Sequence, residues 1–159
     1  MTVTRFELEA ARLVMTRRWA ALATLGDDGP SASMVAYASA RDLSRLVLFL
    51  SSLAEHTRNL INEPRVNLVV SETDPGDGDP QTLARVSVKG VAEVIERTSS
   101  EFEDFWRIYV DRLLDAAPRI VLGDFSLFQV VVEEARYVGG FAQAITIPIA
   151  RLSAAALEF

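Results

Sequence analysis

The pattern of apolar and polar residues along the chain predicts more strands than helices. Short apolar or alternating runs, each bounded by turn-forming residues, predict β-strands. These runs cover residues 19–25, 31–39, 45–51, 65–71, 82–96 and 125–138. The first two runs flank Gly26-Asp27-Asp28-Gly29-Pro30, which is typical of a hairpin turn. Gly90 interrupts the alternation of the long run over 82–96, and we expect a bulge or bend there.

Elsewhere the apolar residues recur with helical spacing. The spacing of Thr4-Arg5-Phe6-Glu7 fits a capping box and predicts a helix over 4–17, and a shorter helix is predicted over 52–63. Thr98-Ser99-Ser100-Glu101 repeats the capping-box spacing, so we expect a third helix that ends before Pro118. Its apolar stripe is the strongest in the chain and consists of Phe102, Phe105, Trp106, Tyr109, Leu113 and Leu114.

The order of these elements favours one fold class. Strands joined mostly by short turns, without a helix after each strand, predict a mainly antiparallel, closed sheet with peripheral helices. A doubly wound parallel fold would need regular helical crossovers. We expect residues 1–159 to form a single domain with its core at about 5–145, because the remaining tail, 146–159, is too short for a second domain.

The composition excludes several classes of protein. Half of the 159 residues are hydrophobic and 24% are charged, which is enough apolar material for one globular core. The apolar runs are shorter than the roughly 18 residues of a membrane-spanning helix, and the first residues lack the features of a signal peptide. The chain has no Cys, hence no disulfide and no thiolate site. We therefore expect a cytoplasmic protein without a membrane partner.

Charge and histidine content limit the chemistry further. The formal net charge of −6 opposes non-specific binding of nucleic acid, which requires a basic face. The single histidine, His56, excludes metal sites that need two or more imidazoles. We expect no bound catalytic metal ion, and redox chemistry would therefore depend on an organic cofactor.

The most informative polar segment lies between a strand and a helix. Ser51 and Ser52 follow an apolar strand, and His56, Thr57 and Arg58 lie in the first part of the next helix. Hydroxyls, helix-start N–H groups and a guanidinium at such a junction are typical of a phosphate site. The alternative is a capped helix with a surface arginine. The Ser–His neighbourhood is a weak indication of a hydrolase, because the chain has no G-x-S-x-G motif.

Several segments, in this order, carry a resemblance to a known family. They are WAALATLGDDGPSASMV, LVLFLSSLAEHTRNLINEPRVNLVV, ARVSVKGVAEVI, GDFSLFQV and EEARYVGGFAQA, and they cover about residues 5–145. The chain resembles the FMN-binding split-barrel proteins related to pyridoxamine 5′-phosphate oxidase, in particular their haem-utilisation (HugZ-type) branch.

This resemblance implies a homodimer of six-stranded split barrels, with FMN bound in a groove at each of two sites between the subunits. The residues that correspond to the cofactor-binding positions are Ser51, Ser52, His56, Thr57 and Arg58 at the phosphate, Ser33, Met34, Val35 and Ala36 on the strand that lines the ring, and Arg85 near the flavin edge. Arg85 is alternatively an exposed strand residue.

The sequence also departs from the family. Ser33 and Ala38 stand where the authentic oxidases have an arginine and a lysine, and no Arg-x-His motif follows Gly139. Oxidation of vitamin B6 is therefore not expected. The haem-degrading relatives use a histidine in an additional C-terminal region, whereas this sequence has only His56. Haem oxygenase activity is not expected on that ground either.

Two hypotheses about function remain. In the first, the protein is an FMN-dependent oxidoreductase that acts on an unidentified small molecule, with the flavin supplying the chemistry. In the second, it is a non-catalytic module that binds flavin or haem, because the predicted site contains no evident nucleophile or general acid.

Overall fold

The computed structural model describes residues 2–159. Its helices are α1 (Arg5–Thr16), α2 (Glu55–Asn62), α3 (Phe102–Arg112) and α4 (Ile149–Ala156), with the 3₁₀ helices η1 (Pro80–Thr82) and η2 (Leu114–Val121). Its strands are β1 (Trp19–Gly26), β2 (Gly29–Ala36), β3 (Ala38–Ser39), β4 (Arg45–Ser51), β5 (Arg65–Ser71), β6 (Arg85–Ile95), β7 (Phe125–Gly140) and β8 (Gln143–Pro148). Within residues 2–159, no helix is long and apolar enough to cross a membrane.

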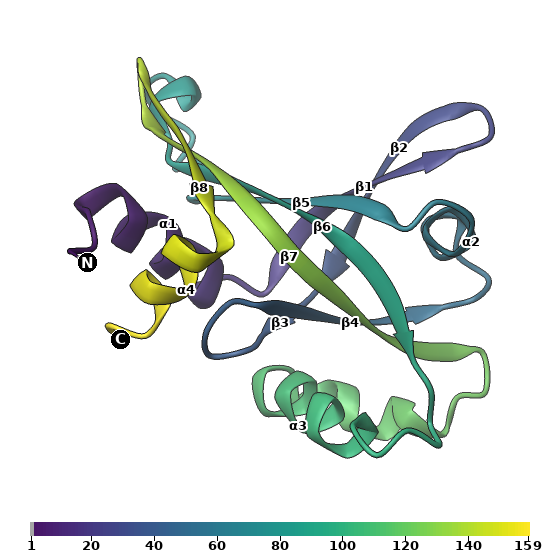
Figure 1. The fold of residues 1–159 in the computed structure, drawn as a ribbon. Coiled ribbons are helices and arrows are strands. Elements are labelled where there is room, and N and C mark those ends of the chain that lie inside the picture. Colours follow the sequence, from purple (N-terminus) through teal and green to yellow (C-terminus); the bar gives the residue numbers. More distant parts are fainter. Residues whose placement is uncertain (1) are drawn as a thin grey trace.

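The described strands form one eight-stranded antiparallel sheet (Figure 1). The order of hydrogen-bonded neighbours is β2-β1-β5-β6-β7-β4-β3, and β8 pairs with β7. The long strands β6 and β7 curve across the molecule, so that the sheet wraps around a core as a split barrel. The mainly antiparallel barrel predicted from the sequence is confirmed. The expected number of six strands is too low, because β3 and β8 were not predicted as separate strands.

The predicted irregularity at Gly90 is confirmed. Lys89 lies opposite Glu134 and Gly90 lies opposite Val132, so Glu133 of β7 is an extra residue that has no counterpart in β6. Such a bulge bends the strand pair. It therefore contributes to the curvature that closes the sheet around the core.

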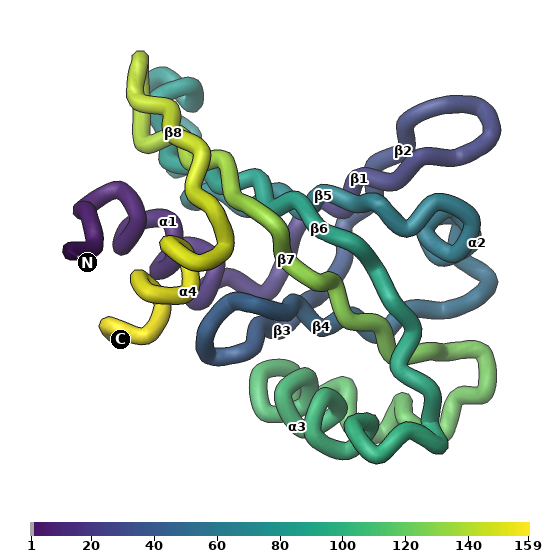
Figure 2. Tube along the Cα trace, viewed as in Figure 1, coloured from purple at the N-terminus to yellow at the C-terminus, as the bar shows by residue number. Residues whose placement is uncertain are grey.

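The interior of the barrel is the larger of two apolar cores. Alternate residues of the strands point into it, among them Leu22, Leu46, Leu68, Val86 and Val130. Helices α1 and α4 lie side by side at one end of the barrel (Figures 1 and 2). Their buried residues, including Val14 and Leu152, belong to the same core.

A buried ion pair fastens α4 to α1. The Arg151 guanidinium donates through Nε to Glu7 Oε1, at 2.6 Å, and through a terminal nitrogen to Glu7 Oε2. The side chains of Arg151 and Glu7 are only 18% and 10% exposed. Glu7 also accepts from the backbone N–H of Thr4 in the capping box predicted from the sequence, which the structure confirms.

A second core lies between α3 and the outer face of the sheet. Phe102, Trp106 and Tyr109 of α3 pack against Val47 and Phe49 of β4. Strand β4 is therefore buried on both faces, which explains its uninterrupted apolar sequence. Three residues of the predicted stripe, Phe102, Trp106 and Tyr109, are thus covered within this chain, whereas Leu114 lies beyond α3 and is exposed.

The C-terminal segment differs from the expected tail. Strand β7 continues to Gly140, and residues 143–156 form β8 and α4, with Leu152 and Ala155 fully buried. Ala142 adopts a positive φ of 61° at the β7–β8 turn, a conformation that is uncommon for alanine. The sequence has no Asn-Gly or Asp-Gly pair at this turn, which is why the hairpin was missed.

Two other features were predicted wrongly, the cap of α3 and the strand over 31–39. The capping box expected at 98–101 does not form, since Glu101 precedes α3 without a side-chain cap. Helix α3 does end before Pro118, at Arg112, and the 3₁₀ helix η2 that follows contains this proline. The strand expected over 31–39 is divided at Tyr37, whose hydroxyl donates to the Val14 carbonyl at 2.6 Å.

Candidate functional site

An open pocket of about 270 Å³ lies where β2, the end of β4 and the start of α2 meet. It brings together half of the cofactor-binding residues predicted from the sequence, although they come from three elements. These residues are Met34, Val35, Ala36, Ser51 and His56. The predicted junction between a strand and a helix therefore does border a pocket.

His56 is the titratable ring in this pocket. Burial lowers the pKa of His56 below its ordinary value, against the opposite effect of the neighbouring Glu55 carboxylate. The imidazole is therefore neutral at neutral pH, and neutral imidazole is the form that binds metals. In the described part of the chain, no hydrogen bond occupies either ring nitrogen.

Aromatic side chains form the opposite wall. The ring of Phe49 lies 5.1 Å from that of Phe125 and 6.0 Å from that of Tyr109, centroid to centroid, and all three line the pocket. Trp19 and Met34 extend the apolar lining towards β1 and β2, and Arg119 of η2 supplies a positive charge. The pocket thus suits a flat, apolar ligand that carries negative charge.

The end of β4 is less suited to a phosphate than the sequence indicated. The Ser51 hydroxyl donates to Asp124 Oδ2 at 2.7 Å, and the Ser52 N–H donates to the Asp124 carbonyl oxygen at 2.7 Å. The Ser51 hydroxyl is therefore already hydrogen-bonded to the Asp124 carboxylate. A phosphate dianion beside Ser51 would be repelled by this carboxylate.

The other predicted site residues do not line this pocket. Ser33, Ser52 and Thr57 are absent from its lining, and Thr57 is buried with its hydroxyl unpartnered among the described residues. Arg58 is exposed and donates to the Leu53 carbonyl at 2.8 Å, which fits the alternative of a surface arginine, although Ala54, which precedes α2, provides no side-chain cap.

Arg85 lies elsewhere in the fold. It begins β6 and donates to the carbonyl oxygens of Gln81 and Leu83, at 2.8 and 3.1 Å, so that it holds the segment around η1. It does not line the pocket beside His56.

Sequence reasoning missed several residues of the pocket. Trp19 and Arg119 line it but lie far from Ser51 in the sequence. Asp124, which accepts from Ser51 without lining the pocket, is also distant, and all three positions depend on the closure of the sheet. For Asp124 the sequence did contain a signal, because the segment GDFSLFQV was part of the family resemblance. Among residues 2–159, no group of three or more His, Cys, Asp or Glu side chains is arranged to hold a metal ion.

The curved antiparallel sheet, closed around its core, defines a split-barrel protein. The family described as pyridoxamine 5′-phosphate oxidase matches residues 6–139, and the chain belongs to this family.

Several of the proteins to which the chain is similar are named for haem. Heme oxygenase HutZ of Vibrio cholerae is 26% identical over 149 residues, which cover 90% of this chain and 81% of that protein. The chloroplastic heme oxygenase HOZ of Arabidopsis thaliana is 32% identical over 119 residues, 72% of this chain and 33% of that protein. A heme-binding protein from Mycobacterium smegmatis has a similar structure, with a TM-score of 0.84, 30% identity and coverage of 97% of this chain and 62% of that one.

Proposed function

We propose that this chain binds haem in the pocket beside His56, with the neutral imidazole as the protein ligand of the iron. The observation that carries the proposal is an imidazole without a hydrogen-bond partner at the edge of an aromatic pocket in the described chain. The names of the similar proteins support haem as the cofactor. Because the chain spans only 62% of the Mycobacterium smegmatis protein, that protein's properties are carried over only as part of the proposal.

The residues present fit haem better than FMN. Haem needs an apolar slot and a nitrogen ligand, and the pocket offers Phe49 and His56 for these roles. FMN needs a cluster of donors for its phosphate, but Asp124 occupies the hydroxyl of Ser51. When bound, haem would supply redox and oxygen chemistry, while the protein would bind it and limit its contact with water.

Replacing His56 with alanine should weaken haem binding strongly. Because the imidazole is the proposed ligand, we expect the loss in affinity to exceed the roughly 10- to 100-fold that outer-shell changes cost at metal sites. The measurement is a titration followed at the Soret band, whose position should also change when the ligand is removed. Arg58→Ala is the matched control, since Arg58 is on the same helix but outside the pocket. Unchanged affinity and an unchanged Soret band in His56→Ala would contradict the proposal.

FMN is the competing cofactor and needs its own titration. FMN should bind more weakly than haem, because the Asp124 carboxylate repels its phosphate. Quenching of flavin fluorescence measures the affinity for FMN, and the titration at the Soret band measures the affinity for haem. If FMN binds tightly, and if Arg58→Ala weakens FMN but not riboflavin, the phosphate site predicted from the sequence is correct and the haem proposal loses its main argument. Adding a reductant to the haem complex in air separates an enzyme, which degrades its haem, from a binding module, which retains the Soret band.

We also propose that a second copy of the chain covers the open side of the pocket. Met34 and Val69 both lie opposite Ala21, on neighbouring strands, and Trp19 is two residues before Ala21 on the same strand. Trp19, Met34 and Val69 are 57%, 50% and 40% exposed, and such a row of large apolar residues is typical of an interface.

Light scattering tests this dimer. The wild-type protein should have twice the chain mass of 17.5 kDa, and Met34→Glu should be a monomer, because the new carboxylate would be buried in the interface. Leu53→Glu is the control, since Leu53 is 76% exposed but lies on α2, away from this row. A monomeric wild-type protein at micromolar concentration would refute the dimer.

A further inference from the structure

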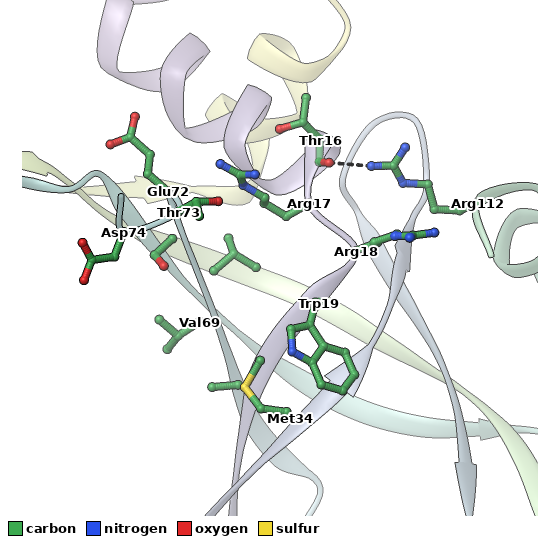
Figure 3. A pocket seen from close by; sticks show the side chains of 13 residues that line it. Thr16, Arg17, Arg18, Trp19, Met34, Val69, Glu72, Thr73, Asp74 and Arg112 are labelled. Carbon is green, nitrogen blue, oxygen red and sulfur yellow. Dashed lines mark hydrogen bonds between the residues drawn. The ribbon is translucent and has the colours of Figure 1, made fainter. Parts of the chain in front are cut away.

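A larger hollow of about 750 Å³ adjoins the pocket beside His56. Trp19 and Met34 line both, so the two spaces meet at these side chains. Figure 3 shows the hollow between the end of α1, strands β1 and β2, and the residues that follow β5. A flat ligand too large for the smaller pocket could therefore extend along Trp19 into this second space.

Three arginines lie in this hollow. Arg17 and Arg18 join α1 to β1, and Arg112 is the last residue of α3. Arg112 donates to the Thr16 carbonyl oxygen (Figure 3), a contact that satisfies the end of α1. The role of Arg112 in the fold is thus explained by the structure.

Arg17 and Arg18 have no such explanation. In residues 2–159, neither side chain takes part in an ion pair or a hydrogen bond, and Nε of Arg17 is buried without a partner. A buried donor without a partner carries a desolvation cost. In a chain with a net charge of −6, unpaired arginines at one place are not a consequence of overall composition. Both observations indicate an anionic partner.

Acidic and basic residues line different parts of the hollow. Glu72 and Asp74 line it from the segment after β5, whereas Arg18 and Arg112 lie on the other side, nearer Trp19 (Figure 3). The Arg17 guanidinium lies between them, turned towards Glu72. An anion is repelled at the outer end, near Asp74, and attracted towards Arg17 and Arg18. The apolar part of the same ligand is then directed over Trp19 and Met34, towards the pocket beside His56.

We propose that Arg17 and Arg18 bind the two propionate carboxylates of haem, whose porphyrin ring lies against Trp19 and Met34. This inference rests on the proposed haem binding and adds the residues that orient the ring. Carboxylates are the natural partners of guanidinium groups, which donate to them in a planar fork. Haem is a ligand whose flat apolar body carries its carboxylates on one edge, as the hollow and the pocket together require.

The test compares iron-free protoporphyrin with its dimethyl ester, in which both carboxylates are neutral. Quenching of tryptophan fluorescence measures both affinities, since Trp19 lines the site. Wild-type protein should prefer the free acid by about tenfold or more, the range expected for charge-assisted hydrogen bonds. The double variant Arg17→Ala/Arg18→Ala should lose this preference and bind acid and ester alike. Arg17→Lys/Arg18→Lys should retain part of it.

Arg107→Ala is the matched control, because Arg107 is an exposed arginine of α3 that does not line the hollow. It should leave the ratio of the two affinities unchanged, and thermal unfolding will show that each variant is folded. If the wild-type protein binds acid and ester with equal affinity and still binds haem, the role of the arginines is overturned and the proposed haem binding stands. Failure to bind haem at all would overturn the proposed function and this inference with it.

Discussion

Replacing Gly90 with alanine will lower the free energy of unfolding by about 3 kcal/mol, the upper part of the range for overpacked sites. A Cβ at this position would lie 2.4 Å from the Val131 carbonyl oxygen and 2.8 Å from Cγ1 of Val130. The nearer atom belongs to the backbone of β7, so a change of rotamer cannot relieve the contact. The bulge between β6 and β7 would have to move instead.

Urea denaturation measures this loss directly. Gly123→Ala is the control, since a Cβ there meets no atom within 4 Å. It should change the free energy of unfolding by less than about 0.5 kcal/mol, as surface substitutions usually do. If Gly90→Ala were as stable as Gly123→Ala, the close approach of the two strands at the bulge would be wrong.

Replacing Arg151 with alanine will also destabilise the fold at neutral pH, and by more than the loss of an exposed ion pair does. The substitution leaves the Glu7 carboxylate, whose side chain is only 10% exposed, without its partner, and an enclosed charge without a partner destabilises the fold. Lys89→Ala is the control, because it breaks an ion pair whose side chains are 57% and 42% exposed. Exposed pairs contribute roughly 0 to 1 kcal/mol.

The pH dependence of this effect has a defined sign. The hydrogen bonds from Arg151, together with those from Thr4, lower the pKa of Glu7 from 4.5 to about 2 in the folded protein. A lowered carboxyl pKa stabilises the fold above pH 4.5, and this contribution disappears as the pH falls towards 2. The difference between wild type and Arg151→Ala should therefore shrink over that interval. A difference that stays constant down to pH 2 would show that Glu7 is not the group responsible.

The features that the sequence predicted well depend on neighbouring residues. The capping box at Thr4 needs only the hydroxyl and a carboxylate three residues later, and both are present. The bulge at Gly90 was predictable because a glycine inside an alternating strand pattern often marks a bulge or a bend. The junction from Ser51 to His56 likewise follows from one strand, one turn and one helix.

The remainder depends on contacts between distant parts of the chain. The start of α3 depends on how this helix packs against β4. The helix begins without the cap that Thr98-Ser99-Ser100-Glu101 predicts. The hydrogen bond from Ser51 to Asp124 joins residues 73 positions apart, so no local pattern reveals it. Helix α4 is short and becomes stable through packing on α1, which a single segment cannot indicate.

Successive residues of β4 face two different apolar cores, so substitutions at neighbouring positions have different effects. Leu46 and Leu48 face the interior of the barrel, whereas Val47 and Phe49 face α3. Because Phe49 also lines the pocket, substitutions on that side can reshape ligand selectivity while the neighbouring leucines preserve the barrel. Because Phe49 also packs against Trp106 and Tyr109 of α3, a substitution there changes the second core together with the pocket. Alternation along one strand thus couples ligand selectivity to the packing of α3, while the interior of the barrel stays on the other face.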